Sequence, residues 1–305
     1  MTDDTDDGSS SEETEGDTSG WTDAPDDLVQ SVLDRAHEAG EEGDFATMTE
    51  RLLEGLEDHP GNPYLLCWLG VAEREQGPGG VAYDHFLACL AARPTDAYIL
   101  ATAGSGIAAF DDPDAEGALR TAALLAPDLP LARWLYGAYL IREGMLEDGL
   151  RELRAAKELD GEDALVRYEL GVGLALSGKR EEGIEEMYRS VEQDAADGWV
   201  HVVLGLLLAE EGRMPEAAGV LEEGARLRPE DIEAQLIAAL AGAASGEEDA
   251  PFEMLERARQ WAEGADRALV DEVESRLDDG AEESATWLVE QMGPTALRER
   301  MMTRP

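Results

Sequence analysis

Residues 198–231 read GWVHVVLGLLLAEEGRMPEAAGVLEEGARLRPED, and this segment contains the pattern from which the fold is inferred. Apolar residues up to Leu208 are spaced as on a helix, and Gly212 follows them. A second apolar stretch around Leu221 comes next, and Pro229 closes the segment. The glycine suits the left-handed backbone that ends a helix, whereas the proline cannot continue one. The segment therefore predicts two helices joined by a glycine turn.

The same pattern recurs along the chain. The turn glycines are separated by 34, then 67, then four times 34 positions, and Asp111 stands where the glycine inside the longer gap should be. These glycines are Gly43, Gly77, Gly144, Gly178, Gly212, Gly246 and Gly280. Two further sets of residues keep this register. One consists of small residues, Gly70, Gly104, Gly137, Gly171 and Gly205. The other consists of large apolar residues, Leu52, Phe86, Leu119, Leu153, Met187, Leu221 and Leu255. The small residues predict a close approach of neighbouring helices, with the large side chains filling the space beside them.

The pattern resembles the tetratricopeptide repeat, whose unit is a helix–turn–helix of about 34 residues. The resemblance implies an all-α fold, an α-solenoid in which stacked helix pairs form a right-handed superhelix. We expect a disordered acidic tail over residues 1–27, about seven repeats within 28–265, and degenerate capping helices over 266–305. The repeats are expected at 29–62, 63–96, 97–129, 130–163, 164–197, 198–231 and 232–265. A break at Gly293-Pro294 is expected to set off a last short helix.

The charge of the chain limits its partners. Its 24 Lys and Arg against 69 Asp and Glu give a formal net charge of −45. This charge opposes binding to nucleic acid, which relies on cations that neutralise phosphates, and to anionic membrane surfaces. The acidic excess with only two lysines, Lys157 and Lys179, resembles proteins of extreme halophiles, in which molar salt screens carboxylate repulsion. A GC-rich genome, which favours Arg over Lys, is the alternative explanation.

Motifs that are missing from the sequence indicate where the protein is located and whether it is an enzyme. The two cysteines, Cys67 and Cys89, argue against a disulfide framework, and the first residues lack the charged and apolar regions of a signal peptide. A cytoplasmic protein is therefore expected. Neither a phosphate-binding Gly-Lys-Ser/Thr loop nor a Gly-x-Ser-x-Gly motif occurs, and the four histidines have no metal-ligand spacing. Asp112 and Asp114 resemble the start of a calcium loop, but Ala123 stands where its bidentate Glu belongs. We expect no enzyme activity, no metal and no cofactor.

The resemblance to the repeat family places one face of each first helix on the inner, concave wall of the solenoid. Five of the chain's aromatic residues fall on that face. The expected partner-binding residues are aromatic anchors, an apolar neighbour and two charge partners: Tyr64, Tyr98, Trp134, Tyr168, Trp199, Val172, Arg74 and Arg142. Aromatic anchors are favoured at protein-binding hot spots. The alternative is that these aromatics pack between neighbouring units and form core rather than a groove.

These observations predict a non-catalytic adaptor that binds a protein or peptide partner, as a peptide or a helix, in an aromatic-lined concave groove. Burial of apolar side chains would supply the affinity, because high salt screens charge attraction. The alternative is a self-associating scaffold, a homo-oligomer in which Trp287, Leu288 and Met292 dock on another copy.

Overall fold

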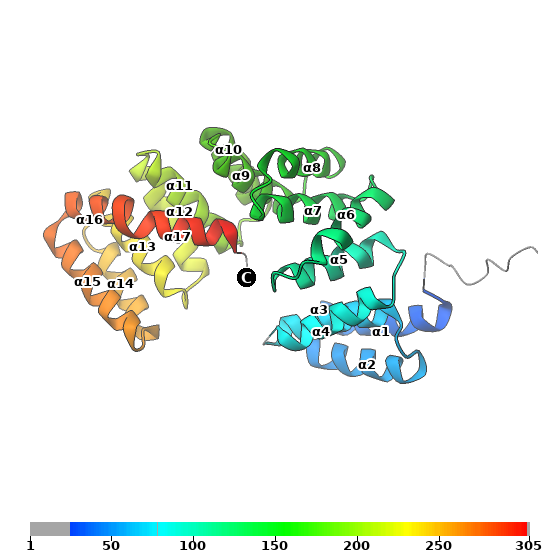
Figure 1. Cartoon of the computed structure of the whole chain (residues 1–305). Coiled ribbons are helices and arrows are strands. Elements are labelled where there is room, and N and C mark those ends of the chain that lie inside the picture. The colour runs from blue at the N-terminus through cyan, green and yellow to red at the C-terminus, as the bar shows by residue number, and fades with distance from the viewer. Residues whose placement is uncertain (1–24, 78, 304–305) are drawn as a thin grey trace, which may run out of the picture. The chain divides into compact units, whose positions relative to one another are not determined.

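The computed structural model describes residues 25–77 and 79–303, so the predicted tail, residues 1–27, lies almost entirely outside the described residues. The described residues form helices without any strand, and they divide at Ile99 and Leu100 into two compact units. Successive helices pack in pairs within each unit (Figure 1), so the predicted all-α class of stacked helix pairs is confirmed. None of the described helices is long and apolar enough to cross a membrane.

The elements follow the chain in order. The first unit contains α1 (Asp27–Glu41), α2 (Phe45–Asp58), α3 (Pro63–Gln76), α4 (Gly80–Ala91) and the first turn of α5 (Ala97–Ala108). The second unit contains the rest of α5 and α6 (Ala115–Leu125), α7 (Pro130–Arg142), α8 (Leu146–Leu159), α9 (Ala164–Leu176), α10 (Arg180–Gln193), α11 (Gly198–Glu210), α12 (Met214–Leu227), α13 (Ile232–Ala244) and α14 (Ala250–Trp261). It ends with α15 (Ala265–Asp279), α16 (Ala281–Trp287), the π-helix η1 (Leu288–Met292) and α17 (Gly293–Met302).

An aspartate or asparagine caps most of the first helices. The Asp163 carboxylate accepts hydrogen bonds from the backbone N–H groups of Leu165 (2.8 Å) and Val166 (3.1 Å). Such a cap satisfies N–H groups that a helix start leaves unpaired. The same arrangement recurs, at the spacing of the repeat, at Asn62, Asp96, Asp197 and Asp231. We call these capping residues the capping ladder. They mark where the first helices begin, whereas the glycine pattern marks only the turns within the pairs.

Left-handed backbone closes most turns between paired helices. The φ angles are 75°, 77°, 84°, 74° and 88° at Gly43, Gly144, Gly178, Gly212 and Gly246. Asp111, the residue in place of the missing glycine, has a φ of 55°. The predicted role of these positions is confirmed. Gly77 differs, since its φ of 160° is extended backbone.

A glycine in the first helix lets the second helix of its pair approach closely. A Cβ placed on Gly171 would lie 2.8 Å from Met187 Cγ and 3.0 Å from the carbonyl oxygen of Gly183. Both distances are too short for a carbon atom, so the Met187 side chain fills the space that the glycine leaves. The same contact joins Gly70 to Phe86, Gly104 to Leu119, Gly137 to Leu153 and Gly205 to Leu221. The predicted packing of small against large residues is confirmed.

The predicted last short helix begins at Gly293, as α17, but the chain stays helical there instead of breaking. Gly293 has helical φ and ψ of −59° and −47°, and its N–H donates to the carbonyl of Leu288, as in a π turn. The wider π turn accommodates Pro294, whose missing N–H and bulky ring would interrupt an α-helix. Helix α17 therefore follows η1 without a loop, and it packs against α11 of the same unit.

Replacing Gly171 by alanine is predicted to lower the free energy of unfolding by about 1–3 kcal/mol, the usual cost of overpacking. The control is Gly219→Ala in α12, where a Cβ would meet nothing within 4 Å. There only helix propensity changes, so stability rises by up to about 1 kcal/mol. Urea unfolding followed by circular dichroism in molar KCl measures both. Equal stability of the two variants would contradict the packing described above.

Candidate partner-binding faces

The predicted binding residues fall into two sets, because the chain divides into two units. Tyr64, Arg74 and Tyr98 lie in the first unit. The second unit holds the other five, Trp134, Arg142, Tyr168, Val172 and Trp199. We describe each set within its own unit.

Aromatic rings from three successive first helices meet in the first unit. His37 of α1 packs edge-on against Trp68 of α3, with ring centroids 4.3 Å apart. Trp68 in turn stacks on Tyr98 of α5 at 6.0 Å, with an angle of 27° between the planes. Tyr98 is 40% exposed, and the other two rings are partly buried. We call these three residues the aromatic row.

The two other predicted residues of the first unit, Tyr64 and Arg74, flank Trp68 in sequence. The Tyr64 hydroxyl lies 3.3 Å from Asp96 Oδ2, and Asp96 also accepts the backbone N–H of Tyr98 at 2.8 Å. This carboxylate therefore fixes the start of α5 and the position of Tyr98. The Arg74 guanidinium is half exposed and pairs with Glu75 at 3.6 Å.

Sequence reasoning identified Tyr98 but missed its two neighbours. Trp68 directly follows Cys67, the residue that the repeat register places on the concave wall. Its side chain nevertheless reaches both His37 and Tyr98. The Trp68 indole is large enough to contact residues on two other helices. The repeat register predicts which face a residue lies on, but it does not predict how far its side chain reaches. Burial lowers the pKa of His37 despite the opposing charges of Asp34 and Glu41, so the imidazole contacts Trp68 as a neutral ring near neutral pH.

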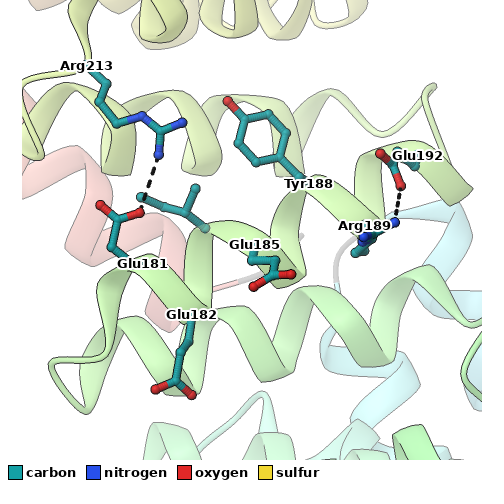
Figure 2. A pocket seen from close by; sticks show the side chains of 8 residues that line it. Glu181, Glu182, Glu185, Tyr188, Arg189, Glu192 and Arg213 are labelled. Carbon is teal, nitrogen blue, oxygen red and sulfur yellow. Dashed lines mark hydrogen bonds and ion pairs between the residues drawn. The ribbon is translucent and has the colours of Figure 1, made fainter.

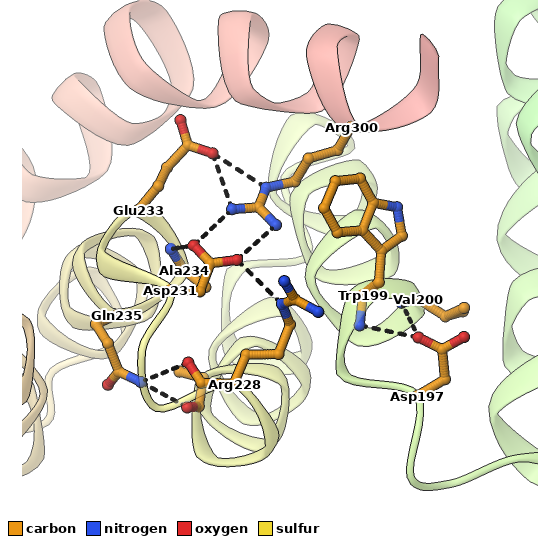
Figure 3. Close-up of polar contacts among 10 residues, drawn as sticks. Asp197, Trp199, Val200, Arg228, Asp231, Glu233, Ala234, Gln235 and Arg300 are labelled. Atoms are coloured by element: carbon orange, nitrogen blue, oxygen red, sulfur yellow. Dashed lines mark hydrogen bonds and ion pairs between the residues drawn. The ribbon is translucent and has the colours of Figure 1, made fainter. Parts of the chain in front are cut away.

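In the second unit, the chain's own last helix covers two of the predicted anchors. Tyr168 is fully buried, and its hydroxyl donates to the backbone carbonyl of Arg300 in α17 at 3.3 Å. Trp199 donates its indole N–H to the Tyr168 hydroxyl at 3.0 Å. The Arg300 guanidinium lies over the Trp199 ring, 4.9 Å from its centroid (Figure 3). These two aromatics therefore contact a helix, and the helix belongs to the same chain.

Arg300 is held by two carboxylates at the start of α13. Its two terminal nitrogens bond the two oxygens of Asp231 at 3.0 and 2.9 Å, and its Nε donates to Glu233 at 3.1 Å. Arg228 also donates to Asp231 at 3.1 Å and lies 5.4 Å from the centroid of the Trp199 ring. We call Arg300, Asp231, Glu233, Arg228 and Trp199 the Arg300 cluster, and Figure 3 shows how they converge.

Burial and charge act in opposite directions on Asp231. Burial alone would raise its pKa, but the hydrogen bonds and charge of Arg300 outweigh burial. The N–H of Ala234 and the Arg228 guanidinium add to this effect, so the pKa of Asp231 lies below its ordinary value. The carboxylate therefore stays ionised and holds Arg300 throughout the neutral and mildly acidic range.

The remaining predicted residues of the second unit are engaged within it. Arg142 donates to Glu169 Oε1 at 2.8 Å, and Glu169 is 3% exposed. Val172 is fully buried. Trp134 is partly buried and packs against the core of this unit. Arg142 thus balances a buried carboxylate of its own chain rather than standing free for a partner's charge.

A pocket of about 440 Å³ runs along α10 (Figure 2). Its lining is mainly charged and consists of Glu181, Glu182, Ile184, Glu185, Tyr188, Arg189, Glu192 and Arg213. Arg213 pairs with Glu181 at 3.5 Å, and Arg189 pairs with Glu192 at 3.2 Å. None of the predicted binding residues lines this pocket, and its arginines are paired with its own carboxylates. Among the described residues, no group of three or more His, Cys, Asp or Glu side chains is arranged to hold a metal ion.

Replacing Asp231 by asparagine is predicted to lower the free energy of unfolding by about 2 kcal/mol near neutral pH, because it leaves the buried Arg300 with Glu233 as its one remaining carboxylate partner of the two. Asparagine keeps the oxygen that caps α13. The folded-state pKa of Asp231 is lowered, so its stabilisation is present above the ordinary carboxyl pKa of about 4 and is lost as the pH falls below it. The stability difference between wild type and variant should shrink over the same range. Unfolding at a series of pH values in molar KCl tests this, and a constant difference would contradict it.

No family model matches the sequence, and no curated protein matches it. Solved structures do match the fold. A tetratricopeptide repeat protein from Parabacteroides merdae superposes with a TM-score of 0.54 at 14% identity, over 84% of this chain and 98% of that one. A chain of the APC/C hetero-tetramer Cut9–Hcn1 superposes with a TM-score of 0.63 at 18% identity, over 79% of this chain and 48% of that chain. YrrB, described as a TPR protein with an unusual peptide-binding site, reaches only 0.42 at 20% identity, over 56% of this chain and 94% of that one.

At these identities, the likeness to the first two structures concerns the fold alone, and the superposition on YrrB is too loose to support an argument. Together with the paired helices and their repeated contacts, the first two matches establish the architecture. The chain therefore has the fold of tetratricopeptide repeat proteins.

Proposed function

We propose that the chain is a non-catalytic adaptor that binds another protein through aromatic side chains on its first helices. The observation that carries the proposal is the aromatic row of the first unit, in which Trp68 and Tyr98 stack and Tyr98 is 40% exposed. Contiguous exposed aromatics are typical of protein-binding surfaces. The Cut9–Hcn1 structure, which shares the fold, is a hetero-tetramer, and this supports a protein as the kind of partner.

Binding at the aromatic row would rest on apolar burial. An apolar side chain of the partner that packs against Trp68 and Tyr98 would gain about 1.5–3 kcal/mol if it is fully buried. This contribution does not depend on charge, so it survives the screening of molar salt. The carboxylate of Asp96, which positions Tyr98 through its backbone N–H, would keep the ring in place while the partner binds.

Self-association through the C-terminal residues is the weaker alternative. Leu288 is fully buried, and Trp287 and Met292 pack against the core of their own unit. Their apolar surface is thus already used within the chain. An adaptor role is favoured because the aromatic row, unlike these residues, leaves a ring 40% exposed.

The adaptor proposal predicts that Tyr98→Ala abolishes the capture of a partner from lysate of the source organism in molar KCl. Phe252→Ala is the matched control, because Phe252 of α14 is also 40% exposed. Quantitative mass spectrometry of the captured proteins measures the effect, with helicity checked for both variants. A partner retained by wild type and Phe252→Ala but lost by Tyr98→Ala is expected. Equal capture by all three chains would place binding away from the aromatic row.

We also propose that the chain is adapted to high salt. Its net charge of −45 makes repulsion among carboxylates the main electrostatic cost of folding, and salt screens this repulsion. Surface pairs such as Arg213–Glu216 lose attraction in salt, but exposed pairs contribute little.

This adaptation predicts that the midpoint of thermal unfolding rises by at least about 5 °C between dilute buffer and molar KCl, equivalent to roughly 2 kcal/mol. Sucrose at matched osmolality, which does not screen charge, should raise it less. A midpoint that stays constant or falls with KCl would contradict the proposed adaptation.

A further inference from the structure

Helix α17 contacts the rest of its unit through a single stripe. Its buried residues recur at intervals of three and four positions, and they are Gly293, Ala296, Leu297, Arg300 and Met301. The residues between them, Pro294, Thr295, Arg298 and Glu299, are exposed. This spacing is that of an amphipathic helix lying in a groove. The opposite case is α13, in which every residue from Ala234 to Gly242 is buried.

The receiving face is built from the first helices α9, α11 and α13. At one end of α17, a Cβ on Gly293 would lie 3.6 Å from Leu206 near the end of α11. At the other end, Arg300 covers Trp199 near the start of α11. Helix α17 thus runs antiparallel to α11, along the face that the sequence predicts to be the concave wall. It lies where a partner's helix was expected.

Recognition of α17 is centred on one arginine. The planar guanidinium of Arg300 meets Asp231 with both terminal nitrogens while its face covers the Trp199 ring. Lysine could provide the charge but neither the two-nitrogen fork nor the flat face. The side chain of Arg300 is only 6% exposed, so this contact is largely removed from water.

We propose that the face formed by α9, α11 and α13 is a binding site for an arginine-bearing amphipathic helix, and that α17 is its intramolecular occupant. The partner it fits carries a small residue, an apolar pair and then an arginine at the spacing of Gly293, Ala296, Leu297 and Arg300. Such a partner competes with α17 for the same contacts. This inference concerns the second unit and goes beyond the proposed function, which rests on the aromatic row of the first.

Because α17 is part of the same chain, it is present at its binding face at a high effective concentration, and a competing helix must exceed that concentration to displace it. Segments joined by short connections act at effective concentrations of about millimolar. A free helix of the same sequence therefore binds the wild-type chain weakly, and it binds more tightly once α17 loses Arg300. The apparent dissociation constant changes in inverse proportion to the fraction of chains whose face is open.

The test uses a fluorescent peptide with the sequence of residues 288–303, LVEQMGPTALRERMMT, and full-length chains in molar KCl. Fluorescence anisotropy should show that the Arg300→Ala chain binds this peptide at least about tenfold more tightly than wild type. The Arg298→Ala chain is the matched control. It loses the same charge from the exposed side of α17 and should bind as wild type does.

Variants of the peptide test whether binding depends specifically on the arginine at position 300. On the Arg300→Ala chain, the Arg300→Ala peptide should bind at least about tenfold more weakly than the unmodified peptide, and the Arg298→Ala peptide should bind equally well. Two results would overturn the proposal: an Arg300→Ala chain that binds no more tightly than wild type, or equal binding of the two variant peptides. If the Arg300→Ala chain lacks wild-type helicity, Arg300→Lys replaces it, and binding no tighter than wild type is again a refutation. Neither result affects capture through Tyr98.

Discussion

The close contact between a glycine of a first helix and a large apolar side chain of its partner helix, which recurs in α3, α5, α7, α9 and α11, is the constraint on which the rest of the structure depends. Gly171 of α9 has no Cβ, so the Met187 side chain of α10 occupies the space beside it and the two helices pack closely. Repetition of this contact at a fixed spacing gives each pair the same geometry. Since the pairs are alike, their first helices present equivalent positions in succession, and residues far apart in sequence come together on one face.

Each unit has such a face of its own, and the two faces are used differently. In the first, His37, Trp68 and Tyr98 form a row that ends in the partly exposed ring of Tyr98. In the second, Tyr168 and Trp199 lie beneath α17, and a buried arginine joins that helix to Asp231. Tyr98 and Trp199, which occupy equivalent positions of the repeat, thus differ: Tyr98 is 40% exposed, whereas Trp199 lies under Arg300 of α17. Neither of the two alternatives inferred from sequence, groove or core, describes both units.

The local features were predictable because they repeat. Glycine turns, the substitution of Asp111 and the small-to-large contacts all follow from residue types at fixed spacing. The capping ladder from Asn62 to Asp231 was equally periodic and could have been found in the same way. What could not be predicted was the contact of α17 with α11 and with the start of α13, since it occurs once and joins residues as far apart as Asp231 and Arg300. The partnership of Arg142 with Glu169 was missed because a register shows which face a residue occupies and not which charge it meets.

Native-state hydrogen exchange of the wild-type chain in molar KCl tests the central claim most directly. If α17 is laid on an array that is complete without it, the amides of residues 295–302 exchange through a local opening. That opening has a lower free energy than the one that exposes α11 and α13. The account predicts this separation of the two free energies. Exchange of α17, α11 and α13 at one common free energy would contradict it, because α17 would then be part of the array rather than a helix bound to its surface.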